Sequence, residues 1–116
     1  MASPGAEKLG RLLMERVRDP SINFFYDLRD GNYGSEHWRG LAAALAAMDP
    51  EQRAVVRRCV SACVDVGIYS LLEALGGSVK ALVDGQEVPD HADEMHYELN
   101  GEDNWIRRFS SFPESA

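Results

Sequence analysis

The side chains best suited to chemistry in this 116-residue chain gather in one window near its end. Residues 84–103 contain eight acidic residues and no lysine or arginine, whereas the rest of the chain contains eleven acidic and twelve basic residues. The window therefore carries a formal charge of −8 and the remainder +1, within a net charge of −7. We call residues 84–103 the acidic segment. Its carboxylates belong to Asp84, Glu87, Asp90, Asp93, Glu94, Glu98, Glu102 and Asp103.

Concentrated negative charge attracts basic surfaces and speeds their encounter with it. The acidic segment therefore predicts a non-catalytic protein-interaction module, an acidic intracellular binding or neutralising protein of the immunity or adaptor kind, which engages a basic protein partner. Trp105 and Phe109 follow the segment. We expect these aromatic side chains to dock on the long central helix, and the alternative is an exposed aromatic anchor on that partner. The alternative is that the segment is only a solvated face, or that Arg107 and Arg108 partly neutralise it.

Two histidines in the acidic segment suggest a second function, a small metal-dependent enzyme or ligand binder. His91 and His96, with Glu94 between them, supply nitrogen and oxygen ligands of the kind that zinc or manganese accepts. On a helix, however, His91 and His96 would point about 140° apart and would not share a face. The sequence also lacks a His-Glu-x-x-His motif, a Gly-x-Ser-x-Gly motif and a phosphate-binding glycine loop. We therefore expect no metal or other cofactor, and we favour a role without catalysis.

Asp65 is an acid placed in an otherwise apolar stretch. A buried carboxylate needs a partner, so we expect an arginine of a neighbouring helix to pair with Asp65, with a ligand-binding or catalytic carboxylate as the alternative. Cys59 and Cys63 are four residues apart, which is too far for a disulfide on a helix. We expect them to be reduced thiols that pack like small apolar side chains.

Charge and hydropathy limit the partners further. An acidic chain has the wrong sign to bind nucleic acid directly or to bind anionic lipid. Glu7 and Glu15 interrupt any export signal, and Asp65 and Glu73 interrupt the one long apolar stretch, so we expect a cytoplasmic protein that does not enter the membrane. A third hypothesis is a self-assembling structural unit, a homo-oligomer formed through that long apolar helix.

The elements that must position these groups are mainly helical. The apolar periodicity predicts a mainly α, single compact domain over residues 1–116, with four to five helices around a long central helix at about 50–75. We expect residues 1–5 to be flexible. The motif Asp49-Pro50-Glu51 supplies an N-cap, a proline at the first helical position and an acid in the first turn, so it marks the start of the long helix. Ser35 is the expected N-cap of the preceding helix.

Two other segments carry clear local signals. In the first helix, Val17 falls on the apolar face and Arg18 on the polar face, and Asp19-Pro20-Ser21 is expected to interrupt the helix. Near 79–88, the dipeptide Asp84-Gly85 favours a small β-hairpin, with a helix continuing through Val83 as the alternative. Two further segments are predicted, a short helix that begins at Asp90 and a last amphipathic one. The last segment begins at Glu102, Asp103 or Asn104 and carries Trp105, Ile106, Phe109 and Phe112 on its apolar side.

Overall fold

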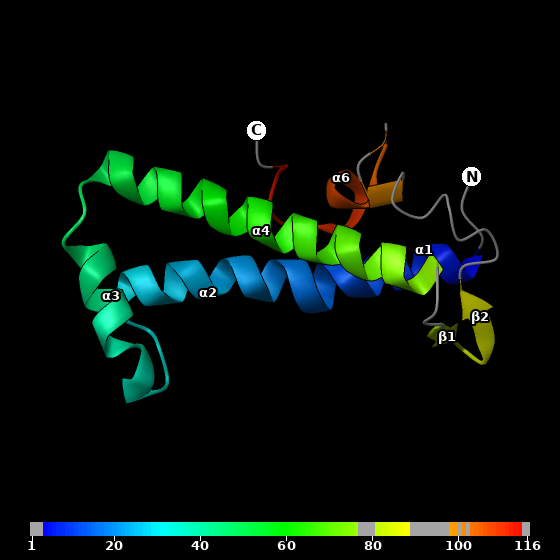
Figure 1. Ribbon diagram of the computed structural model, residues 1–116, viewed down its shortest axis with the longest axis horizontal. Coiled ribbons are helices and arrows are strands. Elements are labelled where there is room, and N and C mark those ends of the chain that lie inside the picture. Colours follow the sequence, from blue (N-terminus) through cyan, green and yellow to red (C-terminus); the bar gives the residue numbers. More distant parts are fainter. Residues whose placement is uncertain (1–3, 77–80, 89–97, 100, 102, 115–116) are drawn as a thin grey trace.

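Two long helical stretches lie side by side and form the body of the molecule (Figure 1). The computed structural model describes residues 4–76, 81–88, 98–99, 101 and 103–114. The first stretch consists of α1 (Pro4–Leu13), the π-helical turn η1 (Met14–Arg18) and α2 (Asp19–Asp30), which follow one another without a break. The second stretch is α4 (Pro50–Gly76), which runs antiparallel to the first.

Shorter elements lie at the two ends of this helical pair. At one end, the 3-10 turn η2 (Glu36–Trp38) and α3 (Arg39–Ala46) connect α2 to α4. At the other end, strands β1 (Ala81–Val83) and β2 (Gln86–Val88) form an antiparallel hairpin that contacts α1. The short helix α6 (Trp105–Phe109) packs on α1 and η1. The mainly α fold class, the long helix at 50–75 and the hairpin near 79–88 are thus confirmed.

Local signals at three boundaries act as the sequence predicts. The side chain of Ser35 accepts a hydrogen bond from the backbone N–H of His37 at the start of η2. The α4 helix begins with a reciprocal capping box, because Asp49 Oδ1 accepts from the Gln52 N–H at 2.8 Å while Gln52 Oε1 accepts from the Asp49 N–H at 3.0 Å. The α6 helix takes Asn104 as its N-cap, since the Asn104 side chain accepts from the Arg107 N–H.

The hairpin turn is also confirmed, because Asp84 and Gly85 both have positive φ angles, as a two-residue turn of this kind requires. The helix expected to begin at Asp90 falls outside the described residues, apart from helical Glu98 and Leu99. At the start of the chain, α1 already includes Pro4 and Gly5. The expected flexibility of residues 1–5 stays a prediction.

The helix break predicted at Asp19-Pro20 is wrong. The π-helical turn just before it lets the helix continue. In η1 the backbone N–H of Asp19 donates to the carbonyl of Met14, five residues back. Pro20 then occupies the first turn of α2. Its missing N–H costs no further hydrogen bond there, because the π-turn has already rearranged the backbone hydrogen bonds at this point. The extra residue in the turn also rotates the helix beyond it by about 100°. Arg18 is therefore fully buried and Val17 is exposed, the reverse of the prediction.

The core is divided along the length of the helical pair. One buried cluster, near the hairpin end, joins α1, the second half of α4 and α6, and includes Met14, Leu72 and Trp105. The other cluster, near α3, includes Phe25, Leu28 and Leu45. Gly10 is required by the first cluster, because a Cβ at this position would overlap the indole ring of Trp105.

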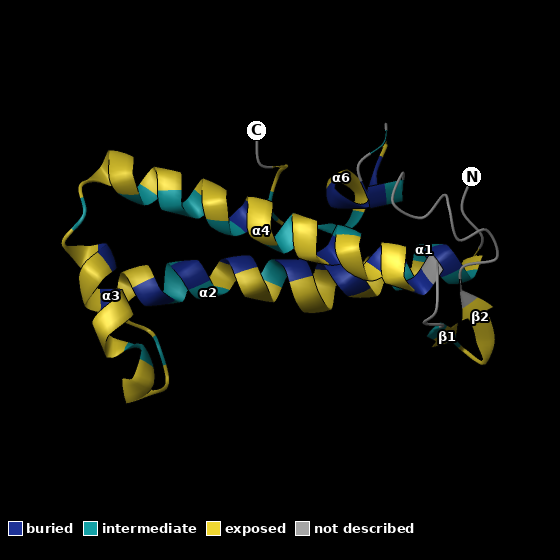
Figure 2. Cartoon of the chain, viewed as in Figure 1, coloured by how far each residue is buried: buried dark blue, intermediate teal, exposed yellow. Residues whose placement is uncertain are grey.

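The helices cover only one side of α4, although the sequence suggested that α4 would be buried along most of its circumference. Figure 2 shows exposed residues along the side of α4 that faces away from α1 and α2. Cys59 and Cys63 lie on this side and are exposed, so their expected packing in the interior is wrong. The radius of gyration is 16.2 Å, compared with about 13 Å for a globular chain of this length. No helix within the described ranges is long and apolar enough to cross a membrane.

Candidate functional site

The described acids of the acidic segment gather around the first turns of α1. Asp84, in the hairpin turn, forms an ion pair with Lys8. Glu98 lies 3.6 Å from the guanidinium of Arg108, and Arg108 also pairs with Glu7 of α1. Glu87 and Asp103 are exposed. The other four acids, Asp90, Asp93, Glu94 and Glu102, lie outside the described residues.

Arg108 connects this acidic end of the molecule to α6. Its Nη2 donates to Glu7 Oε2 at 2.9 Å, and its Nε donates to the carbonyl of Asp103 at 3.0 Å. Trp105 Nε1 donates to the same Glu7 carboxylate at 3.0 Å. These hydrogen bonds, that of Arg108 first, lower the pKa of Glu7 below its ordinary value, although partial burial opposes the shift. Glu7 therefore stays ionised and holds α6 against α1.

The aromatic anchor predicted for a partner is used within the chain. Trp105 is fully buried in the core beside Ile68 and Leu72, so the expectation that it docks within the chain is confirmed and the exposed-anchor alternative is wrong for this residue. Phe109 is half-buried, with the guanidiniums of Arg11 and Arg108 at 4.5 and 5.0 Å from its ring centroid. Burial of a large ring and two cation–π contacts attach α6 to α1, so both side chains stabilise the fold.

The structure leaves the metal hypothesis as a prediction. His91, His96 and Glu94 lie outside the described residues. Within the part of the chain that is described, no group of three histidines, cysteines or acids is placed to hold a metal ion.

Asp65 has the partner that the sequence analysis expected, and that partner is the buried Arg18. Arg18 Nε donates to Asp65 Oδ1 at 2.7 Å and Nη2 donates to Oδ2 at 3.3 Å. The remaining N–H groups of Arg18 donate to Ser110 Oγ at 2.8 Å and to the carbonyls of Phe112 and Pro113. Arg18 thus attaches α4 to the C-terminal segment. The sequence alone could not identify Arg18 as the partner of Asp65, because the π-turn rotates Arg18 inward.

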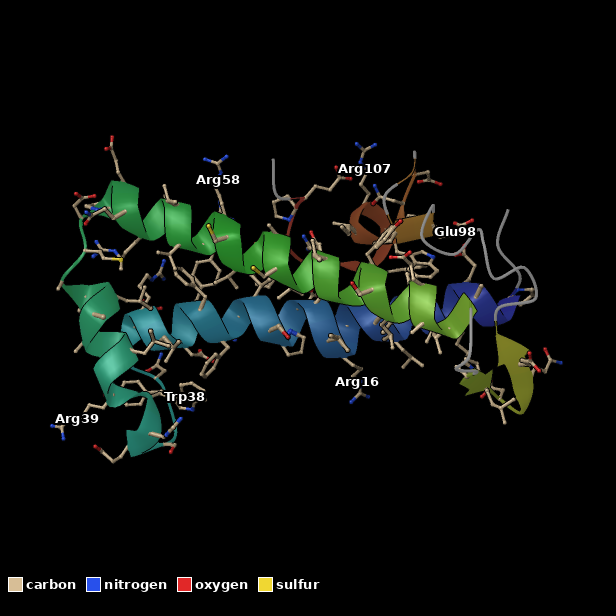
Figure 3. The ribbon with its side chains drawn as sticks, in the orientation of Figure 1. Arg16, Trp38, Arg39, Arg58, Glu98 and Arg107 are labelled. Carbon is tan, nitrogen blue, oxygen red and sulfur yellow. The ribbon has the colours of Figure 1, made fainter. Side chains whose placement is uncertain are left out.

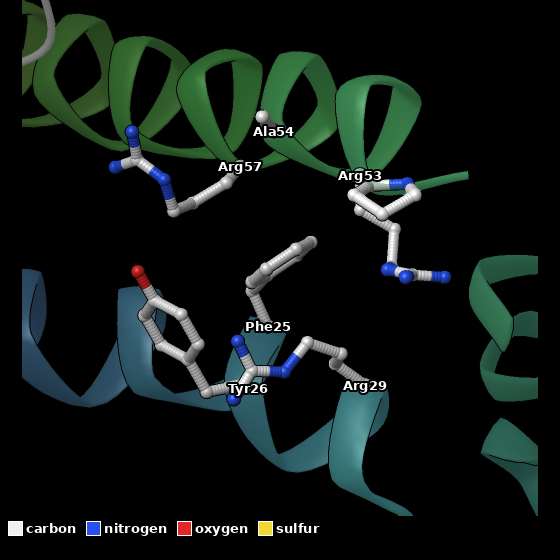
Figure 4. A pocket seen from close by; sticks show the side chains of 7 residues that line it. Phe25, Tyr26, Arg29, Arg53, Ala54 and Arg57 are labelled. Atoms are coloured by element: carbon white, nitrogen blue, oxygen red, sulfur yellow. The ribbon is translucent and has the colours of Figure 1, made fainter. Parts of the chain in front are cut away.

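A groove of about 380 Å³ between α2 and α4 contains arginines that the sequence analysis did not single out (Figure 4). Two of them already serve the fold. Arg53 donates to the carbonyls of Leu45 and Met48 at the end of α3, and Arg29 pairs with Asp30 at 2.8 Å. Arg57 is half-buried and has no hydrogen-bond or ion-pair partner among the described residues. The groove can accept an anionic group at Arg57, but its architecture is explained by helix capping and packing.

The solvent side of α4 forms a continuous surface without charge. Six exposed side chains on this side fall within an arc of about 100° on the helix. No charged side chain occurs on this arc between its first and last members. We call this set the α4 outer face; it consists of Val55, Cys59, Ala62, Cys63, Val66 and Ser70. The apolar pattern was visible in the sequence, but which side of α4 other helices would cover was not.

Comparison with known proteins gave no match, since no family model, no curated protein and no solved structure is similar to this chain. Its function must therefore be inferred from its own charge and geometry.

Proposed function

We propose that this protein is a non-catalytic protein-interaction module that engages a basic protein through the acidic segment. The observation that carries the proposal is the separation of charge, −8 in residues 84–103 against +1 elsewhere. Lys8 and Arg108 form ion pairs with two of these acids. Counting both bases against the segment still leaves six negative charges. Such a surplus favours rapid association with a basic surface.

The positions of the described acids support the same proposal. Asp84 and Glu98 both connect to α1, through Lys8 and Arg108 respectively, so two parts of the segment meet at one end of the molecule. Figure 3 places Glu98 toward this end and Arg39 at the opposite end. A basic partner would therefore meet the acidic end with little repulsion from the arginines near α3.

The proposal is tested by neutralising acids inside and outside the segment. The segment variant carries Glu87→Gln, Asp90→Asn, Asp93→Asn and Glu94→Gln. The control variant carries Glu15→Gln, Asp27→Asn, Glu36→Gln and Glu51→Gln. These four acids lie on other helices, and their replacement gives the same net charge as the segment variant. Binding of both variants and of the native chain to labelled poly-lysine is measured by fluorescence anisotropy at several salt concentrations.

We expect the segment variant to raise Kd by about tenfold or more and to weaken its dependence on salt, because the local field is lost. The control variant should change Kd by less than about threefold, since its acids are dispersed. Equal losses in the two variants would mean that only net charge matters, and the proposal would then be rejected.

A further inference from the structure

We propose that the protein is a homodimer in which the α4 outer faces of two copies pack together in antiparallel orientation. This inference does not depend on the proposed function, because it concerns a different surface. Three observations carry it: the composition of the face, the distribution of charge along α4, and the length of α4.

The α4 outer face is exposed and carries no charged side chain between Val55 and Ser70. Val55 and Val66 have 55% and 64% of their surface exposed, and Cys59, Ala62 and Cys63 are exposed between them. A helix with one side exposed to solvent normally presents charged residues on that side, and 27% of this chain is charged. A contiguous exposed apolar surface marks a site of association. A small residue such as Ala62 would let a second helix axis approach to about 8 Å.

The charges along α4 select a second copy in antiparallel orientation. Arg57 and Asp65 are half-buried against the rest of the chain. The exposed charges of α4 between residues 55 and 76 are therefore Arg58 in the first half and Glu73 in the second. Parallel packing would place each of these charges beside its own copy, whereas antiparallel packing can place Arg58 beside Glu73. In an antiparallel pair centred between Asp65 and Val66, Arg58 lies level with Glu73 of the copy. Figure 3 shows Arg58 projecting from the side of α4 away from α2.

The length of α4 allows an extended contact between two copies. The α4 helix has 27 residues and is therefore about 40 Å long. Pairing along most of this length must bury roughly 1,000 Å² over two copies to reach the lower limit for specific association. A twofold axis makes the same face serve both partners, the commonest arrangement of soluble oligomers. We therefore expect a reversible dimer.

The first experiment measures mass by sedimentation equilibrium on the full chain. The native chain should be a dimer at tens of micromolar, and Val66→Glu should raise the dimer Kd at least about tenfold because it places a charge at the centre of the interface. Leu41→Glu is the matched control, since Leu41 is a half-exposed leucine on α3 and receives the same charge. A native chain that is monomeric at all concentrations overturns the proposal, as does equal dissociation by the two substitutions. Circular dichroism confirms that both variants are folded.

The second experiment fixes the orientation with the native cysteines. About the proposed centre, the two copies of Cys63 lie about 8 Å apart along the axis, and the two copies of Cys59 about 20 Å apart. A short bis-maleimide should therefore cross-link Cys59→Ser, which retains Cys63, but not Cys63→Ser, which retains Cys59. Equal cross-linking of the two variants indicates parallel packing and overturns the antiparallel arrangement.

The third experiment uses charge exchange. Arg58→Glu and Glu73→Arg should each weaken the dimer, because each places like charges together across the axis. The double variant should recover most of the native affinity, because both charge pairs are restored with their signs reversed. Loss of stability in the monomer would not produce such recovery. A double variant weaker than both single variants contradicts the proposed register.

Discussion

Arg18 occupies its buried position because a guanidinium can satisfy several acceptors at once. Its five N–H donors lie in one plane, and they reach Asp65, the hydroxyl of Ser110 and two backbone carbonyls. The C-terminal segment, which has little helix of its own, is thereby attached to η1 and α4. Ser110 in turn donates to Asp19, so the network closes on the start of α2.

Replacement of Arg18 should be among the most damaging substitutions in the chain. Arg18→Ala leaves the Asp65 carboxylate and two carbonyls without their donor, and we expect the free energy of unfolding to fall by about 3–5 kcal/mol. Arg16→Ala is the control, because Arg16 is exposed two residues away and should cost less than about 0.5 kcal/mol. Chemical denaturation measures both, and equal losses would contradict the structural role of Arg18.

Glu7 should make stability depend on pH. Its folded-state pKa is lowered below 4.5, so its carboxylate contributes stability above that pH, and the contribution is lost as pH falls through the folded-state pKa. We expect Glu7→Gln to be less stable than the native chain at pH 7, with the difference shrinking as the pH falls below about 4.5. Thermal melting from pH 7 to pH 3 measures the difference. Glu15→Gln is the control, since Glu15 makes only an exposed contact with Arg11.

At the level of elements, the capping box of α4 illustrates how far local sequence signals reach. Asp49 was identified as the cap from the sequence, and the structure adds the reciprocal bond from Gln52. Each side chain satisfies a backbone N–H that the first turn of a helix leaves without a partner. The direction of the chain at the end of α3 is set by the same residues, because Arg53 binds the carbonyls of Leu45 and Met48.

Removal of this cap should weaken α4 measurably. Asp49→Ala should lower the free energy of unfolding by about 1 kcal/mol, whereas Asp49→Asn should retain most of it because asparagine caps equally well. Urea denaturation at neutral pH distinguishes the two variants. If asparagine and alanine were equally destabilising, the carboxylate charge rather than the hydrogen bond would account for the effect.

The first helical stretch shows where element prediction fails. Pro20 signalled an end to the helix, but the π-turn at η1 allows helical backbone to continue from Pro4 to Asp30. A helical wheel with a constant 100° per residue cannot represent that turn. The predicted apolar and polar faces of the first helix were therefore wrong at Val17 and Arg18.

For the molecule as a whole, the two proposed surfaces respond differently to solution conditions. Attraction between the acidic segment and a basic partner is electrostatic, so it weakens as salt rises. Packing of α4 outer faces is mainly apolar, and salt screens only its flanking charges. Because the two proposals concern different residues and different forces, one surface can fail its test while the other passes.

The sequence by itself determined the elements: the mainly helical composition, the long helix that begins after Asp49, the hairpin at Asp84-Gly85 and the location of the negative charge. These follow from short-range chemistry, since caps, turn residues and apolar spacing act within a few residues. Only the tertiary structure decided which faces meet. The buried position of Arg18, the burial of Trp105 and the exposure of Cys59 and Cys63 depend on how one helix is rotated against another. That rotation is set by packing between residues far apart in the sequence, which local patterns do not record.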